Sequence, residues 1–126
     1  MNPISVIGAF VMTFAFLAYG IGSVTLERFR IVGSVVLIFL SLGVLFESIA
    51  ILMMIIGSNG SISLLHGIVG ALAFLLMLVN TGWAWMVYLT GGIDSPVNLW
   101  LVNYTKTAFF LWVLAYFTGI VFLIWL

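Results

Sequence analysis

The chain has 126 residues, of which 66% are hydrophobic and 5% charged, and its formal net charge is zero. Soluble domains carry about a quarter charged residues, so this composition excludes a soluble globular domain. Three cations are too few to bind nucleic acid, and there is no cysteine for a disulfide or a thiolate ligand. The sequence therefore predicts an integral, multi-pass protein of the cell membrane.

Four apolar segments are long enough to cross a bilayer, which takes about 20 helical residues for about 30 Å of hydrocarbon. They span approximately residues 3–24, 31–57, 61–89 and 97–126. Because they take up nearly the whole sequence, we expect a single all-α transmembrane domain, a four-helix bundle with up-down topology. Such a chain has no soluble domain in which to carry out chemistry, so we expect no catalytic activity of its own.

The three cations predict the orientation of the bundle. Arg28 and Arg30 lie in the first connection, and Lys106 follows the third apolar segment. In an up-down bundle these positions fall on the same side of the membrane. The positive-inside rule assigns that side to the cytoplasm, which makes both termini extracytoplasmic.

The second apolar segment contains Glu47, the one carboxylate inside the run 31–57. A helical rise of about 1.5 Å per residue places it about 15 Å from the outer end, near the midplane. An ionised group there costs roughly 2.5–3.5 kcal/mol, so it usually faces protein, a partner or water. It could handle a proton or a ligand, or hold a partner subunit. Alternatively, it is a neutral acid that is hydrogen-bonded to a backbone carbonyl or a hydroxyl, because burial disfavours the charged form.

Small residues predict where helices approach one another. Gly43 lies one turn before Glu47 and leaves space beside the carboxylate on its own helix face. In the third segment, Gly67, Gly70 and Ala71 would let another backbone come close. We interpret these residues as packing positions.

The third segment carries the one histidine, His66, and further on a polar residue, Asn80. His66 could ligate haem iron or a metal, relay protons, or simply form a structural hydrogen bond. Metal sites normally need three or four ligands, and only Met53, Met54 and Glu47 could join His66, so no self-contained metal site is expected. Asn80 is expected to link helices through a hydrogen bond worth about 1 kcal/mol.

Several short motifs lie along all four segments. They are Tyr19 to Gly22, Glu27-Arg28-Phe29-Arg30, Leu42-Gly43 before Glu47, Leu65-His66-Gly67-Ile68-Val69-Gly70, Leu76-Met77-Leu78 and Trp83-Ala84. Together they resemble small four-helix bacterial membrane proteins described as haem-sensing. The resemblance implies haem b held by histidines, with further histidines where Asn80 stands and near Thr105. This chain keeps His66, which would supply one axial ligand.

Three functions from different classes remain open. The first is a small accessory or structural subunit of a larger integral-membrane redox or oxygenase complex, of the copper membrane monooxygenase or respiratory type. Its neighbours would be other membrane subunits and lipids. The second is a haem-b-binding or haem-sensing membrane protein that uses His66. The third is a small pathway for protons or a solute through Glu47.

Overall fold

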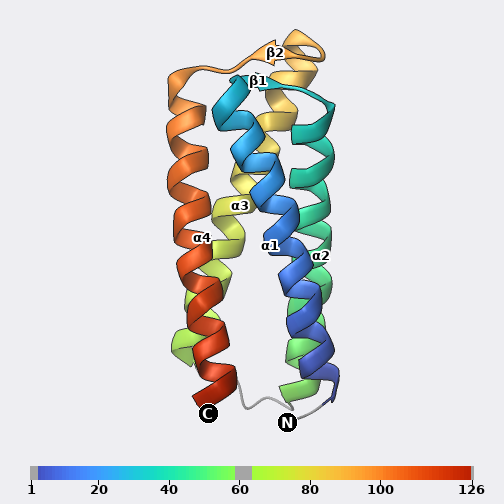
Figure 1. The fold of residues 1–126 in the computed structure, drawn as a ribbon, viewed down its shortest axis with the longest axis vertical. Helices are drawn as coiled ribbons and strands as arrows, with labels where there is room; N and C mark the ends of the chain where they lie inside the picture. Colours follow the sequence, from blue (N-terminus) through green and yellow to red (C-terminus); the bar gives the residue numbers. More distant parts are fainter. Residues whose placement is uncertain (1–2, 59–63, 126) are drawn as a thin grey trace.

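The computed structural model describes residues 3–58 and 64–125, without the side chains of residues 5, 58, 64–66 and 122–125. Four long helices stand side by side (Figure 1): α1 (Pro3–Phe29), α2 (Ser34–Ser58), α3 (Leu64–Gly91) and α4 (Leu99–Trp125). Each contains a stretch long and apolar enough to cross a membrane. The all-helical architecture with four such helices is therefore confirmed, while its orientation in a membrane stays a prediction.

The two ends of the bundle differ in what they contain. Both chain termini lie at one end, which we call the terminus end (Figure 1). The α1–α2 and α3–α4 connections lie at the other, the connection end. There, α1 continues to Phe29, beyond the predicted end at residue 24, so Glu27 and Arg28 belong to its last turns. The residues predicted to start the second helix form a short strand instead.

This strand, β1 (Ile31–Val32), pairs antiparallel with β2 (Ser95–Pro96) from the α3–α4 connection. Asp94 N donates a hydrogen bond to Val32 O at 2.9 Å, and Val97 N donates one to Arg30 O, also at 2.9 Å. The strand pair therefore ties the α1–α2 hairpin to the α3–α4 hairpin at the connection end.

Residues with positive φ, a left-handed backbone conformation, allow the α1–α2 and α3–α4 connections to turn within a few residues. Arg30 has φ 56°, Gly92 has φ 86° and Asp94 has φ 60°. Arg30 N donates to Leu26 O at 2.8 Å and so closes the last turn of α1, as a left-handed residue just past a helix commonly does. Asn98 Oδ1 accepts from Leu101 N at 2.9 Å and caps the start of α4.

Glycines bring α1 and α2 close together. A Cβ at Gly22 would lie 3.0 Å from Leu40 Cγ, and one at Gly8 would lie 3.3 Å from Ala50 O. A methyl group at either position would be tighter than most Cβ contacts and would require its neighbours to shift. The close packing of the α1–α2 hairpin therefore depends on glycine at both levels.

The close approach predicted along the start of α3 is not found within the described part of the chain. A Cβ at Gly70 would meet nothing within 4 Å, and both Gly67 and Ala71 are exposed. The reason is the helical period, because α3 turns Ala73 and Met77 inward and thereby carries Ala71 to the outer face.

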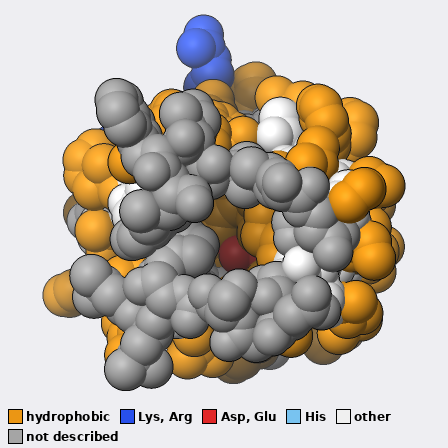
Figure 2. Space-filling view, turned by 90° about the horizontal axis from the view of Figure 1, so that it is seen from below, with side chains coloured by type: hydrophobic (Ala, Val, Ile, Leu, Met, Phe, Trp, Pro, Cys, Tyr) orange, Lys and Arg blue, Asp and Glu red, His pale blue; other side chains and the backbone are white. Residues whose placement is uncertain are grey.

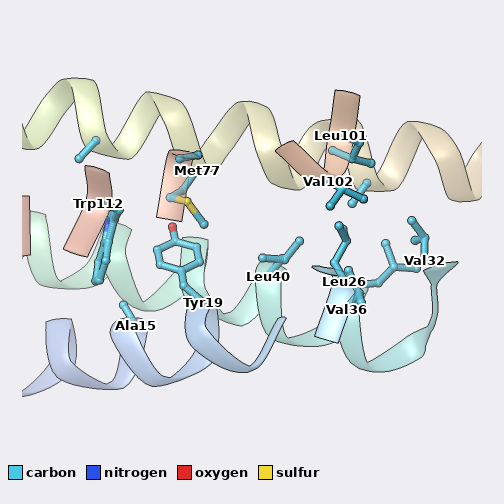
Figure 3. Packing of buried hydrophobic residues seen from close by; sticks show 14 residues of the cluster. Ala15, Tyr19, Leu26, Val32, Val36, Leu40, Met77, Leu101, Val102 and Trp112 are labelled. Atoms are coloured by element: carbon cyan, nitrogen blue, oxygen red, sulfur yellow. The ribbon is translucent and has the colours of Figure 1, made fainter. Parts of the chain in front are cut away.

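The core is apolar towards the connection end and mixed towards the middle (Figure 3). Near the connections, six aliphatic side chains are each at most 2% exposed, and we call them the apolar plug: Leu26, Val32, Val36, Leu40, Leu101 and Val102. Further along the bundle, Tyr19, Met77 and Trp112 replace them (Figure 3). The polar chemistry of the interior therefore begins where the plug ends.

Candidate functional site

Glu47 lies in the middle of α2 and points into the bundle, with its side chain 3% exposed. Tyr19 Oη of α1 donates a hydrogen bond to Glu47 Oε1 at 2.7 Å. Trp112 Nε1 of α4 donates one to Oε2 at 2.9 Å. We call these three residues the carboxylate site. It joins α1, α2 and α4 at one level through the one buried charged residue among those described.

Gly43 makes the contact between Tyr19 and Glu47 sterically feasible. A Cβ at Gly43 would overlap the ring of Tyr19, whose side chain is fully buried. The sequence analysis predicts that Gly43 leaves space on the helix face that carries Glu47. What fills the space is the Tyr19 ring from the neighbouring helix, which the sequence did not indicate.

The two donors differ in what they allow the carboxyl group to do. An indole N–H can only donate, so Oε2 facing Trp112 must act as an acceptor. A phenol can donate or accept, so Tyr19 Oη donates to ionised Glu47 across the 2.7 Å contact and, with its own hydrogen turned away, can accept from a protonated Glu47 Oε1. The carboxylate site can thus hold Glu47 either ionised or protonated without moving a heavy atom.

Aromatic side chains form the wall of the site towards the terminus end. The Tyr116 ring stacks on Trp112 with a centroid separation of 5.6 Å and an interplanar angle of 13°. Phe16 meets the edge of both rings, at 5.9 Å from Trp112 and 5.0 Å from Tyr116. Tyr116 Oη is 2.8 Å from Thr13 Oγ1, so polar groups of α1 and α4 continue from the site towards this end.

The space-filling view from the terminus end shows a hollow with an acidic side chain at its floor (Figure 2). The chain has three acidic residues, of which Glu27 and Asp94 belong to the connection end. Glu47 is the one acidic residue among those described whose side chain is buried, and it lies midway along α2. At the other end, the apolar plug separates the carboxylate site from the connections.

The other predicted polar residues are His66 and Asn80. His66 lies in the first turn of α3, and its side chain is outside the described set. Asn80 is fully buried, and its Oδ1 accepts a hydrogen bond from Thr105 Oγ1 at 2.8 Å. The expectation that Asn80 links two helices is thus met, between α3 and α4.

The haem hypothesis meets a specific difficulty at Asn80 and Thr105, where the resemblance implies histidines. These residues bond to one another, and neither is a usual ligand of haem iron. Across the described residues there is no group of three His, Cys, Asp or Glu side chains that could hold a metal ion. Haem b at His66 stays a prediction.

The three cations all lie towards the connection end. Arg28 occupies the last turn of α1, Arg30 follows it, and Lys106 is in the first third of α4, with all three side chains exposed. Glu27 interacts electrostatically with Lys106. The cations therefore share one end, as the predicted cytoplasmic side requires.

The sequence contained weak signals for the partners of Glu47. Tyr19 and Trp112 each bear a hydrogen-bond donor inside an apolar segment, which is unusual enough to suggest a buried acceptor. Their pairing with Glu47 depends on how the helices are rotated and shifted against one another. That information is not local, so the sequence analysis missed both residues.

The fold and the site together define a four-helix protein with potential membrane-spanning helices and one buried carboxyl group tied to three of them. Comparisons with protein-family models, curated proteins and solved structures find no match to this chain. The resemblance to haem-sensing membrane proteins therefore stays a prediction from the motifs quoted above.

Proposed function

We propose that this protein is a small membrane carrier in which Glu47 binds a proton or a small cationic solute. The observation that carries the proposal is a buried carboxyl group in the middle of the bundle, and the view from the terminus end shows an acidic side chain at the floor of a hollow (Figure 2). Ionisable groups at membrane depth are costly and mark ion or proton pathways in many membrane proteins. Glu47 has the chemistry for this role.

The surroundings of Glu47 support reversible binding. Tyr19 and Trp112 hold the carboxyl group in a fixed position with two donors, at 2.7 and 2.9 Å. Ordered donors stabilise an ionised carboxylate in a low-dielectric interior, and the Tyr19 contact also accommodates the protonated form. A group that is stable in both states can load and release a proton.

Access from only one end favours a carrier over an open channel. The six plug residues are all aliphatic and close the centre of the bundle near the connections, and an ion does not cross such a barrier readily. Release on that side requires the plug residues to separate, which is the alternation of access that carriers use. In this conformation the site faces the terminus end.

Proton flux into liposomes tests this function. Purified protein is reconstituted with a trapped pH-sensitive dye, and a potassium diffusion potential drives uptake. We expect flux from the unaltered protein and its loss in Glu47→Gln, which retains the shape of the side chain and can keep an acceptor oxygen towards Trp112 while its NH2 group faces Tyr19 Oη. Glu27→Gln, at the connection end, is the matched control and should conduct as before. Equal flux with Gln at position 47 would exclude Glu47 as the carrier group.

A second candidate function, the accessory subunit of a larger membrane redox or oxygenase complex, has one specific observation in its favour. The small residues Gly67, Gly70 and Ala71 lie open on α3, where a helix of another chain could approach closely. Purification in mild detergent, read by mass spectrometry and visible absorbance, should then yield stoichiometric partners that Gly70→Leu releases. Purification of the protein alone would contradict this function, and a haem spectrum lost in His66→Ala would favour the haem hypothesis.

A further inference from the structure

A second polar layer lies inside the bundle, about one helical turn from the carboxylate site towards the connection end. Its members are Ser23, Asn80 and Thr105, each 0% exposed. Ser23 follows Tyr19 by four residues on α1, and Asn80 follows Met77 by three on α3. These spacings place Ser23 and Asn80 on the inward faces of their helices.

Two contacts place the three residues in one cross-section of the bundle. A Cβ at Gly20 of α1 would lie 3.6 Å from Phe109 Cζ of α4. Because these helices run antiparallel, Ser23, one turn after Gly20, is level with Thr105, one turn before Phe109. Thr105 Oγ1 in turn donates to Asn80 Oδ1 at 2.8 Å. The layer therefore spans α1, α4 and α3.

Several polar atoms at this level have no hydrogen-bond partner among the described residues. They are Ser23 Oγ, Asn80 Nδ2 and, beside Asn80, Thr81 Oγ1. A buried polar group without a partner costs about 1–3 kcal/mol, and native proteins satisfy nearly all of them with protein groups or ordered water. Several such atoms in one layer indicate a bound molecule with hydrogen-bonding capacity.

The shape of the layer suits a small ligand. Serine, threonine and asparagine are short, whereas the neighbouring levels are filled by larger side chains such as Leu26 and Tyr19. On α2 the corresponding place is taken by Leu40, which Gly22 allows to pack against α1. Short polar side chains at three corners of the cross-section provide the hydrogen-bonding partners that internal water needs.

We propose that Ser23, Asn80 and Thr105 form a binding site for internal water, with Asn80 Nδ2 donating to the water and Ser23 Oγ exchanging a hydrogen bond with it. Each such water typically makes about three hydrogen bonds, a number that this layer can supply together with Thr81. The water fixes Asn80 and Ser23 in a membrane interior that offers no other partner.

The position of this water site also deepens the proposed carrier function, and this part of the inference rests on that function. The site lies between the carboxylate site and the plug residues Leu26 and Leu101, and Met77 lies beside the Tyr19 hydroxyl (Figure 3). Methionine side chains are unbranched and flexible, so Met77 can shift when water or a proton passes. A proton that leaves Glu47 for the connection end would pass to this water first, which leaves the plug as the dry barrier.

Water-edited solid-state NMR of the full chain in lipid bilayers tests the water site directly. Magnetisation should pass from water to the Asn80 side-chain amide, which is identified by its absence in Asn80→Leu. The backbone amide of Leu26, in the apolar plug, should receive none. Ser23→Ala should lower the transfer to Asn80 severalfold, and Thr118→Val, which loses only a bond to its own helix, should leave it unchanged. If the Asn80 side-chain amide received as little magnetisation from water as the Leu26 backbone amide, the proposed water site would be wrong.

Flux measurements separate this inference from the carrier function. If the carrier function holds, Ser23→Ala should slow proton flux severalfold while Thr118→Val does not, and unchanged flux in Ser23→Ala would remove the water site from the route. If Glu47→Gln has no effect on flux but water still reaches Asn80, the carrier function fails and the water site stands. If Glu47→Gln abolishes flux and no magnetisation passes from water to the Asn80 amide, the carrier function stands and the water site fails.

Discussion

The connection end and the terminus end of this bundle are built from the same four apolar helices, yet they differ in how they are closed. At the connection end, β1 pairs with β2 and aliphatic side chains fill the centre. At the terminus end, a hollow leads to an acidic side chain, and the interior contains a carboxyl group, a phenol and an indole. Closure at one end keeps the helices together while the other end leaves a polar site accessible.

The two ends are also stabilised by different forces. In a membrane, lipid tails are as apolar as leucine, so burial of the plug residues would stabilise the fold there through close packing and not through removal from water. Around Glu47, the stabilising contacts are directional hydrogen bonds between helices. Close-packed aliphatic side chains in the plug offer water no hydrogen-bond partner, whereas the polar side chains around Glu47 can bond to it.

The largest expected difference between the two ends is in access of water-soluble reagents. The chain has no cysteine, so a single introduced thiol reports on one position. Ala15→Cys lies in the terminus half and Ala84→Cys in the connection half, and both alanines are 0% exposed. We expect a small methanethiosulfonate to modify the thiol at position 15 and to leave the one at position 84 intact. Equal modification of both thiols would contradict the inference that the connection end is closed to water and the terminus end is open to it.

Gly43→Ala should have the largest effect on stability, because it acts where the two halves meet. The added methyl group overlaps the buried Tyr19 ring and displaces its hydroxyl from Glu47. Overpacking together with the lost hydrogen bond should cost about 2–4 kcal/mol. Thermal unfolding in detergent measures the change. Gly82→Ala is the control, since a Cβ there meets nothing within 4 Å, and its stability should stay the same or rise.

Removing one donor from Glu47 should have an intermediate effect. Trp112→Phe leaves Oε2 without its partner and should destabilise the protein by about 1–3 kcal/mol, and Tyr19→Phe should do the same at Oε1. Unfolding of both single variants and of the double variant gives the coupling between the two bonds. Trp85→Phe, which loses a bond to Ser41 on the outer surface, should cost less. An equal loss in all three would argue against a special role for the buried carboxyl group.

The smallest expected effect concerns the connection end alone. Asp94 has φ 60°, a left-handed conformation that costs other L-residues about 1–2 kcal/mol and that glycine adopts freely. Asp94→Ala should therefore lower the free energy of unfolding by about 1 kcal/mol, and Asp94→Gly should lower it less. Neither variant should change how readily the methanethiosulfonate reagent modifies the thiol introduced by Ala15→Cys. Opening of the terminus half by Asp94→Ala would show that the two ends are coupled.

The number and approximate extent of the helices could be predicted from the sequence because hydrophobic length is a local property. The midplane level of Glu47 followed from the same count along α2. The ends of the helices were less accurate, since the backbone of α1 continues through Glu27 and Arg28 to Phe29. Packing at Gly70 was also expected and is not made within the described chain, because small residues alone do not say which face turns inward.

By itself, the sequence determined an all-helical chain with four segments able to span a bilayer, one carboxyl group in the middle and three cations at one end. These features depend on hydrophobicity and on distance along a helix, which are properties of single segments. Only the tertiary structure decided that Tyr19 and Trp112 are the partners of Glu47, and that Asn80 meets Thr105. Those contacts depend on how each helix is rotated and shifted against its neighbours, a choice that many side chains make together.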